Sequence, residues 1–357
     1  MMGGTGATLA GWAWEADTAS ARAVRAALAP AAAVYGAVVG LRNRLYDGGW
    51  LGATRVGARV ISVGNLVVGG TGKTPAALWL AEECTKRGRR VALVARGYRK
   101  RRRGVVVVSD GTRVLVRPEE GGDEAVMLAH RFGGPVVTGE RRAEAAAEAV
   151  RRFGVDTIVL DDGFQHRALA RDADLVLVRG DPSAHGVLPS GPLREPVRAL
   201  ARATAVLALG DLDFPPSPPG VPRGVRVFRG RTAPTSVVRA HGGAWREGPL
   251  SELAGRDVVA VAGVARPERL AGMLAALGAC VVRTETFPDH HAYGTRDLAR
   301  LRATGGCLVT TEKDLVKLAG RLDGIDLVAL RLGVEVERGA ALVDLLLGDA
   351  AVDFAGV

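Results

Sequence analysis

A glycine-rich loop between a predicted strand and a predicted helix constrains the fold of this 357-residue chain more than any other feature. Residues 59–63 form a β-branched run that is typical of a buried strand, and residues 75–87 have the apolar period of a helix. The loop between them contains Gly69-Gly70-Thr71-Gly72-Lys73-Thr74. Glycines let backbone N–H groups face phosphates, and the N-terminus of a helix adds a positive dipole. The sequence therefore predicts a P-loop that binds the phosphates of a nucleotide.

Two side chains at the end of this loop suit that chemistry. Lys73 can reach the β- and γ-phosphates, and the Thr74 hydroxyl can ligate Mg²⁺. The usual spacing of the motif would place a glycine where this chain has Val67. The motif is therefore incomplete at its first position, but a strand and a helix flank it as phosphate binding requires. We expect nucleotide binding with Mg²⁺ despite this departure.

Strands and helices alternate along most of the chain. Apolar runs that are typical of buried strands, separated by helical patterns, predict an α/β fold with a mostly parallel sheet. A proline-rich stretch at residues 214–220 is typical of a linker or a domain seam, and the alternation resumes after it. We therefore expect a P-loop domain at residues 47–220 and a smaller C-terminal α/β domain at residues 221–357. Residues 1–17 are predicted to be an extension.

The segment at residues 18–46 differs from both domains. Its helical pattern is expected to break near Pro30. Residues 28–41 are nearly all apolar, but they are fewer than the ~20 residues that a membrane-spanning helix needs. Such a helix either lies in a membrane interface or packs on the protein's own core, and the sequence leaves both open. The cationic residues that flank the apolar stretch are Arg22, Arg25, Arg42 and Arg44.

Composition narrows the range of partners. The 48 Lys and Arg residues exceed the 38 Asp and Glu residues by ten, which suits anionic partners but is also expected of a basic solvated surface. Aromatic residues, which stack on bases, make up only 4% of the chain, so we do not expect nucleic-acid binding. The three cysteines are scattered, and such an odd, sparse set argues against a disulfide framework and for a reducing compartment.

Paired carboxylates follow a second predicted strand. Asp161 and Asp162 come directly after the apolar run at residues 157–160. A carboxylate at the tip of a parallel strand beside a P-loop is where P-loop proteins hold their Mg²⁺. A plain turn would also explain the pair, and the sequence does not separate the two aspartates. We expect this pair to contribute to a metal site.

Three further polar clusters have ordinary explanations when each is taken alone. Residues 122–124 could cap a helix, residues 163–166 could form a turn, and residues 289–291 could form a loop or a metal-binding pair. A histidine beside a carboxylate can also serve acid–base catalysis. No single cluster decides a function.

Taken together, these pieces resemble the tetraacyldisaccharide 4′-kinase family, whose members act in the lipid A pathway. A glycine loop alone is shared by many families, whereas the order and spacing of all these motifs is specific. The matching stretches are Leu45-Tyr46 with Gly49, Val63 to Pro75, Ala95 to Tyr98, Gly122-Asp123-Glu124, Leu160 to His166, Pro192 to Pro196, Phe287 to His291 with Tyr293, and Thr310 to Asp314.

The resemblance implies a reaction and a location. Members of the family transfer the γ-phosphate of ATP to the 4′-hydroxyl of a tetraacylated glucosamine disaccharide 1-phosphate, which gives lipid IVA. The resemblance implies a monotopic enzyme on the cytoplasmic face of a bacterial inner membrane, with its N-terminal helix touching lipid. It also implies two RecA-like domains joined by a hinge. Val67 stands where the family's loop likewise lacks the first glycine.

The resemblance also implies roles for single residues. Lys73 and Thr74 would serve ATP and Mg²⁺, together with the loop residues Gly69 to Gly72. Asp123 would accept the proton of the sugar hydroxyl, and His290 would hold that carboxylate, with His291 as the alternative partner. The side chains that would arrange the metal and the nucleotide are Asp161, Asp162 and Glu195.

A switch or partition ATPase with a deviant Walker motif is the main alternative. Such proteins also carry Gly-Gly-x-Gly-Lys-Thr and can sit on membranes, but they place a signature lysine just before the paired glycines. This chain has Val68 at that position. The sequence therefore favours the kinase, and it leaves acyl-chain selectivity and oligomeric state open.

Overall fold

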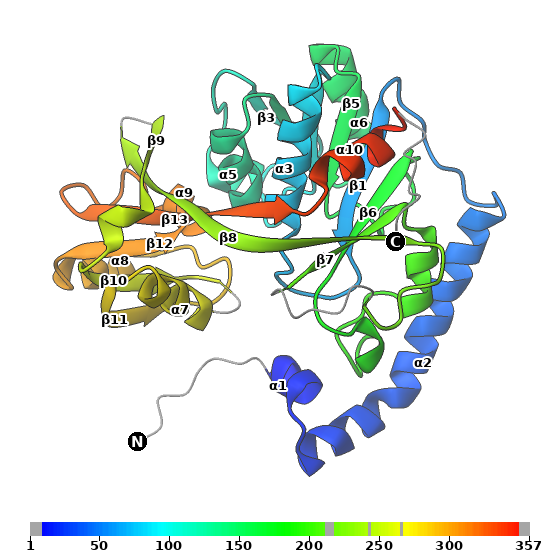
Figure 1. The fold of residues 1–357 in the computed structure, drawn as a ribbon, viewed down its shortest axis with the longest axis horizontal. Coiled ribbons are helices and arrows are strands. Elements are labelled where there is room, and N and C mark those ends of the chain that lie inside the picture. Colours follow the sequence, from blue (N-terminus) through cyan, green and yellow to red (C-terminus); the bar gives the residue numbers. More distant parts are fainter. Residues whose placement is uncertain (1–8, 211–217, 242–243, 265–266, 350–357) are drawn as a thin grey trace. The chain divides into compact units, whose positions relative to one another are not determined.

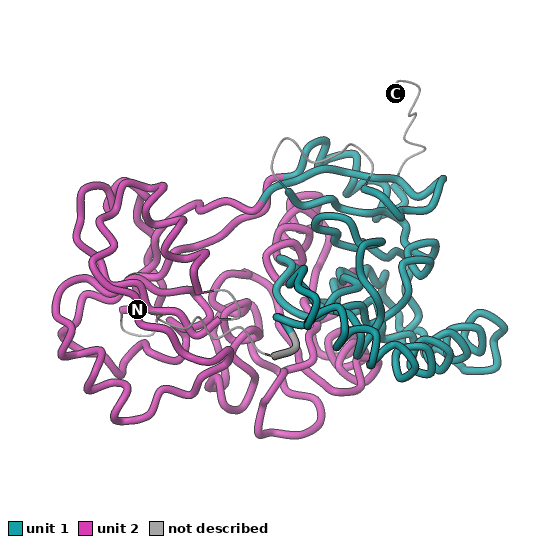
Figure 2. The backbone as a smooth tube through the Cα atoms, turned by 90° about the horizontal axis from the view of Figure 1, so that it is seen from below, with its two compact units in different colours: residues 1–73, 159–231, 336–357 teal, residues 74–158, 232–335 magenta. Residues whose placement is uncertain are grey.

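The structure is a computed structural model that describes residues 9–210, 218–241, 244–264 and 267–349. The chain forms two compact units, which Figure 2 shows in different colours. The first unit comprises Met1–Lys73, Val159–Arg231 and Val336–Val357, and the second comprises Thr74–Ile158 and Thr232–Glu335. The domain limits expected from the sequence, at residues 47–220 and 221–357, stay a prediction. Within the proline-rich stretch, residues 214–217 lie outside the described part of the chain.

The first unit contains a parallel sheet that carries the P-loop. β1 (Arg59–Asn65) pairs with β6 (Ala173–Val178), β6 pairs with β7 (Ala205–Leu209), and β7 pairs with the first part of β8 (Arg226–His241), all in parallel. Every residue of β6 and β7 is buried. Parallel strands that are covered on both faces have such continuous apolar runs. The strand expected before the glycine loop is therefore confirmed as β1.

The N-terminal helix of the first unit differs from its prediction. α2 (Ala19–Asp47) runs without interruption through Pro30, so the expected break is wrong (Figure 1). A proline removes one backbone hydrogen bond, but Pro30 is exposed and is flanked by alanines, which favour the helix more than any other residue. Thr18 caps the helix by accepting a hydrogen bond from the Ala21 N–H at 3.2 Å. The segment predicted as an extension contains a helix of its own, α1 (Leu9–Glu15), which packs on α2.

The second unit contains two groups of strands. In one, β10 (Asp257–Ala262) lies between β11 (Cys280–Thr286) and β12 (Cys307–Thr311), and β12 pairs with β13 (Asp326–Val336), all in parallel. In the other, β4 (Pro135–Thr138) pairs in parallel with β2 (Val91–Ala95) and antiparallel with β3 (Val106–Asp110). β9 (Ala244–Gly248) pairs antiparallel with the second part of β8. The predicted α/β class with mostly parallel strands is confirmed.

Helices connect these strands and place the polar clusters. α5 (Asp123–Arg131) packs against α9 (Glu312–Leu318), although the two helices are far apart in the sequence. This contact brings Asp123, the predicted catalytic aspartate, close to the motif at Thr310 to Asp314. The other α-helices in the described residues are α3 (Lys73–Lys86), α4 (Pro118–Gly121), α6 (Arg142–Phe153), α7 (Glu268–Ala276), α8 (Thr295–Ala303) and α10 (Gly339–Leu347). β5 (Thr157–Asp161) ends at the first of the paired carboxylates.

Candidate active site

The segment directly before the glycine loop is held by backbone hydrogen bonds within the first unit. The Val68 N–H donates to the Pro192 carbonyl at 2.9 Å, and the Arg194 N–H donates to the Leu66 carbonyl at 2.6 Å. Gly69 and Gly72 have φ values of +108° and +90°, which side chains with a Cβ rarely adopt. α3 then begins at Lys73, so the loop delivers its backbone to a helix N-terminus as the sequence predicts.

Asn65, the last residue of β1, fixes the glycine loop by a side-chain hydrogen bond. The Asn65 Nδ2 donates to the Thr71 Oγ1 at 2.7 Å, and the Gln165 Nε2 donates to the Asn65 carbonyl at 2.9 Å. The Arg179 Nε donates to the Thr71 carbonyl at 3.3 Å. Arg179 lies in none of the sequence motifs quoted above. Its position directly after β6, the strand that neighbours β1, was the signal that could have found it.

The structure gives the two paired aspartates different surroundings. Asp161 is buried as the last residue of β5, whereas Asp162 follows it with φ +57° and is only half-buried. The Asp162 Oδ1 lies 3.8 Å from the Lys73 Nζ, and the Arg194 guanidinium contacts both Asp162 oxygens, at 3.0 and 2.9 Å. A non-glycine residue held in the left-handed region is a sign of a functional constraint. Asp162 is therefore the better candidate for contact with a ligand at the P-loop.

The donors at this site suit Mg²⁺ bound together with a nucleotide. Mg²⁺ takes oxygen ligands, keeps several waters and usually binds one or two carboxylates plus substrate phosphates. In the described part of the chain, no three His, Cys, Asp or Glu side chains gather into a group that could hold a metal by themselves. The Asp162 carboxylate, which lies 3.8 Å from the Lys73 Nζ, has hard oxygens of the kind that a phosphate-bound Mg²⁺ takes as ligands.

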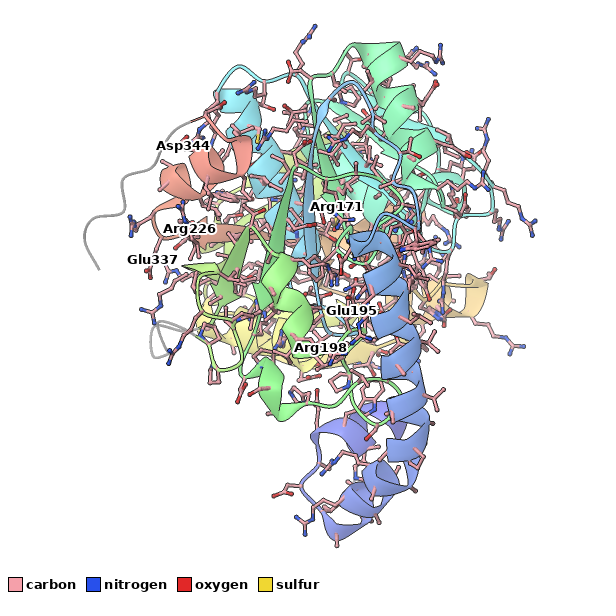
Figure 3. All side chains as sticks on the ribbon, turned by 90° about the vertical axis from the view of Figure 1, so that its right-hand side faces the viewer. Arg171, Glu195, Arg198, Arg226, Glu337 and Asp344 are labelled. Carbon is pink, nitrogen blue, oxygen red and sulfur yellow. The ribbon has the colours of Figure 1, made fainter. Side chains whose placement is uncertain are left out.

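Glu195 has partners of its own. Its buried Oε2 accepts hydrogen bonds from the Asn43 Nδ2 at 2.7 Å and from the Arg202 guanidinium at 2.9 Å. Figure 3 shows Glu195 beside α2, the helix that carries Asn43. These contacts tie α2 to the segment that supports the glycine loop. The metal role expected for Glu195 stays a prediction.

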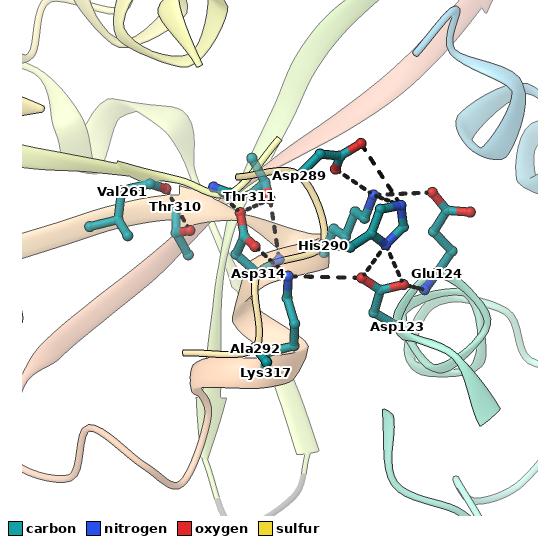
Figure 4. Close-up of polar contacts among 12 residues, drawn as sticks. Asp123, Glu124, Val261, Asp289, His290, Ala292, Thr310, Thr311, Asp314 and Lys317 are labelled. Carbon is teal, nitrogen blue, oxygen red and sulfur yellow. Dashed lines mark hydrogen bonds and ion pairs between the residues drawn. The ribbon is translucent and has the colours of Figure 1, made fainter. Parts of the chain in front are cut away.

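The second unit brings Asp123 and His290 into contact across 167 residues of sequence. The His290 Nδ1 lies 2.9 Å from one Asp123 carboxylate oxygen and 3.2 Å from the other (Figure 4). Asp123 is the first residue of α5, and His290 has φ +61°. His291 pairs elsewhere, because its Nε2 lies 2.8 Å from an oxygen of Asp297. The structure thus pairs Asp123 with His290 rather than with His291.

Cations keep the buried Asp123 carboxylate charged. Burial by itself would raise the pKa of Asp123, but the hydrogen bond to His290 and the charges of Lys313 and Lys317 outweigh it, so the pKa is lowered. The Lys317 Nζ lies 3.8 Å from the Asp123 Oδ2 and 2.8 Å from the Asp314 Oδ1. Lys313 belongs to a motif quoted above, whereas Lys317, one turn later on α9, was missed by the sequence analysis. The site therefore holds a charged Asp123 carboxylate next to the imidazole of His290 and the ammonium group of Lys317.

Comparisons with known proteins identify the family of the chain. A sequence model of the tetraacyldisaccharide-1-P 4′-kinase family matches residues 24–350. The chain belongs to this family. A tetraacyldisaccharide 4′-kinase from Anaeromyxobacter dehalogenans strain 2CP-C is 45% identical over 336 residues, which cover 89% of this chain and 88% of the relative. Another, from Syntrophus aciditrophicus, is 41% identical over 321 residues, which cover 83% of this chain and 84% of the relative.

A solved structure has the same fold. The crystal structure of LpxK from Aquifex aeolicus in complex with ATP aligns with a TM-score of 0.79 at 31% identity, covering 91% of this chain and 99% of that one. The family resemblance and the P-loop α/β fold expected from the sequence are therefore confirmed.

Proposed function

We propose that this chain is an ATP-dependent kinase that phosphorylates the 4′-hydroxyl of a tetraacylated glucosamine disaccharide 1-phosphate, which gives lipid IVA. The observation that carries the proposal is its membership, over residues 24–350, of the tetraacyldisaccharide-1-P 4′-kinase family. The Asp123–His290 pair supports it, because transfer to a sugar hydroxyl needs a proton acceptor. The glycine loop supplies the site for the phosphate donor.

The donor side neutralises and positions phosphate charge. Phosphoryl transfer passes through a loose transition state, so catalysis depends on positioning and on electrostatic stabilisation. The backbone of Gly69 to Gly72 would surround the phosphates, and Lys73 would contribute a positive charge. A bound Mg²⁺ would supply further positive charge for the phosphates. Thr74 and Asp162 would hold it, with Asp161 as the second carboxylate at the same strand end.

On the acceptor side of the reaction, the 4′-hydroxyl of the sugar has to lose its proton. Asp123 would accept the proton of the 4′-hydroxyl as the bond between the sugar oxygen and the γ-phosphorus forms. The bond from this phosphorus to the β–γ bridging oxygen breaks, and ADP leaves. His290 would keep the carboxylate oriented. A carboxylate with a lowered pKa is a weak base towards a free alcohol. In a loose transition state the proton leaves late, when the hydroxyl oxygen already shares its electrons with phosphorus and the proton has become acidic. A charged, fixed Asp123 suits that late transfer.

An acceptor assay tests the function directly. We expect the protein with γ-labelled ATP, Mg²⁺ and the tetraacylated disaccharide 1-phosphate in detergent to yield a labelled lipid. Lys73→Ala is the matched control, because it removes the donor-side charge at the loop. The proposal fails if folded wild-type protein gives no more labelled lipid than this control.

We propose further that α2 docks the enzyme on the cytoplasmic face of the inner membrane as a monotopic protein. Val34, Val38 and Leu41 recur at helical spacing and are exposed to solvent. α2 is long and apolar enough to span a membrane by length and composition. However, the Tyr35 hydroxyl donates to the Arg194 carbonyl at 2.9 Å, and Asn43 holds Glu195. A helix with one face tied to its own unit and one apolar face exposed suits an interface better than a span.

Val38→Asp is expected to weaken binding to vesicles that contain phosphatidylglycerol by roughly tenfold, because burying a valine contributes about 1.5 kcal/mol. Cosedimentation with such vesicles measures the effect. Val282→Asp is the matched control: Val282 is exposed to 62% and Val38 to 61%, but Val282 lies on β11. Equal losses for the two variants, or no loss for Val38→Asp, would contradict docking through α2.

A further inference from the structure

Lys313 contacts the ring nitrogen of His290 that faces away from Asp123. The Lys313 Nζ lies 3.0 Å from the His290 Nε2. The same Nζ lies 3.1 Å from the Asp289 Oδ1 and 3.3 Å from the Glu124 Oε1. Figure 4 shows Asp289 and Glu124 on either side of His290. The imidazole therefore stands between a carboxylate on its Nδ1 and a lysine on its Nε2.

The neighbouring carboxylates keep Lys313 protonated. Burial by itself would lower the pKa of Lys313, but the carboxylates of Glu124, Asp123 and Asp289 outweigh it, so the pKa is raised. Lys313 is therefore an ammonium group at neutral pH. An ammonium group has three hydrogen-bond donors and no acceptor, and Lys313 has three acceptors around it: Glu124, Asp289 and the His290 Nε2.

This contact decides where the imidazole carries its proton. Because Lys313 can only donate, the His290 Nε2 must accept and cannot carry a hydrogen. The proton of the neutral ring then lies on Nδ1, from which it is donated to the Asp123 carboxylate at 2.9 Å. We propose that Lys313 is a positioning residue that fixes His290 in the Nδ1–H tautomer and so orients the hydrogen bond to Asp123. The inference rests on the proposed function only for its effect on turnover.

The other protonation states of His290 conflict with its surroundings. In the Nε2–H tautomer, that hydrogen would point at the Lys313 ammonium, and the Nδ1 lone pair would face the Asp123 oxygens. In the doubly protonated ring, the same hydrogen would again meet Lys313 at 3.0 Å. The Asp289 Oδ2 lies 3.9 Å from the Nε2, which is too far for a hydrogen bond that would compensate. Only the Nδ1–H tautomer satisfies both ring nitrogens.

The positions of Lys313 and Lys317 provide a matched pair of variants. Both lysines lie on α9 and lower the pKa of Asp123 by their charge. Lys313 contacts the imidazole, whereas Lys317 contacts the carboxylates of Asp123 and Asp314. Lys313→Met removes the donor to Nε2, and Lys317→Met removes a similar charge from the same helix without touching the ring. Lys313→Arg restores a cationic donor.

The experiment is nitrogen NMR on the full chain labelled with ¹⁵N at histidine, because the shifts of the two ring nitrogens report the tautomer. The chain has six histidines, and His290→Gln identifies the signal of His290. We expect the Nδ1–H tautomer in the wild type, in Lys317→Met and in Lys313→Arg. In Lys313→Met we expect a mixture with the Nε2–H form. An Nε2–H form in the wild type, or an unchanged signal in Lys313→Met, would overturn the proposal.

Kinetics on the same variants separate positioning from folding. The lost orientation of one hydrogen bond to a charged group is expected to lower kcat of Lys313→Met by about 10- to 100-fold, with the KM for ATP unchanged. Lys313→Arg is expected to recover most of this loss. A KM for ATP that rises together with the fall in kcat would contradict an effect through His290. If the wild type shows the Nδ1–H tautomer but phosphorylates no lipid, the proposed function fails while the tautomer assignment stands.

Discussion

Asp123→Asn is expected to lower kcat by about 100- to 10,000-fold, which is the usual contribution of a positioned acid–base group. The amide has the shape of the carboxylate, and its oxygen can still accept the hydrogen bond from the His290 Nδ1, which lies 2.9 Å away. It cannot take up the proton of the sugar hydroxyl. The affinity for ATP should stay unchanged, because the proposed phosphate site is the glycine loop and not Asp123. Steady-state kinetics and calorimetric titration with a non-hydrolysable ATP analogue measure the two quantities separately.

The second Asp–His pair of the same unit supplies the control. Asp297 and His291 are 2.8 Å apart and have the same chemistry as Asp123 and His290, so Asp297→Asn makes the identical change outside the proposed site. It should leave kcat close to that of the wild type. An equal fall in kcat for both variants, or an equal loss of ATP affinity and turnover in Asp123→Asn, would remove the assignment of Asp123 as the base.

The lowered pKa of Asp123 predicts how kcat/KM depends on pH. Because the pKa of Asp123 is lowered, its carboxylate stays charged at pH values where an ordinary aspartate, with a pKa of about 4, begins to take up a proton. In the wild type, kcat/KM should therefore not show a loss from Asp123 until the pH drops below that range. In Asp123→Asn this acid limb should be missing from the residual activity.

Local sequence patterns predicted the strand and the helix that flank the glycine loop. A buried strand, a glycine loop and a helix follow one another along the chain, so periodicity and glycine content were enough to find them. The prediction that the N-terminal helix breaks at Pro30 was wrong, because the apolar pattern of the sequence does not show how a proline is surrounded in the folded chain. The effect of a proline depends on which side of the helix it occupies and on its neighbours, and Pro30 is exposed and flanked by alanines.

The acceptor side could not have been assembled from local patterns. Asp123 and His290 meet because α5 packs on α9 and on the loop that precedes α8, and no periodicity in the sequence describes such a contact. Only the family resemblance connected the two residues. The partners of Glu195 were hidden for a related reason: burial beside Asn43 and Arg202 depends on tertiary packing, which the motif alone does not reveal.

The packing of α5 on α9 depends on a buried cluster of charges. The Glu312 Oε2 accepts a hydrogen bond from the Arg131 guanidinium at 2.9 Å, and its Oε1 accepts one from the Arg331 Nε at 2.7 Å. Arg131 ends α5, and Glu312 begins α9 directly before Lys313. The Glu312 carboxylate therefore contacts both arginines, and its pair with Arg131 joins the helices that carry Asp123 and the lysines around it.

Glu312→Gln is accordingly expected to lower the free energy of unfolding by about 3–5 kcal/mol, because removing one member of a buried ion pair leaves the remaining charges uncompensated. The amide keeps the volume of the side chain, so the loss reports the charge rather than a cavity. Urea unfolding followed by circular dichroism measures it.

Glu247→Gln is the control, since Glu247 also contacts Arg331 but its side chain is exposed to 57%, against 5% for Glu312. An exposed ion pair is worth about 0–1 kcal/mol. If both variants lost the same small amount, the cluster would not be what holds α5 on α9, and the frame around Asp123 would have to depend on the apolar packing of the two helices instead.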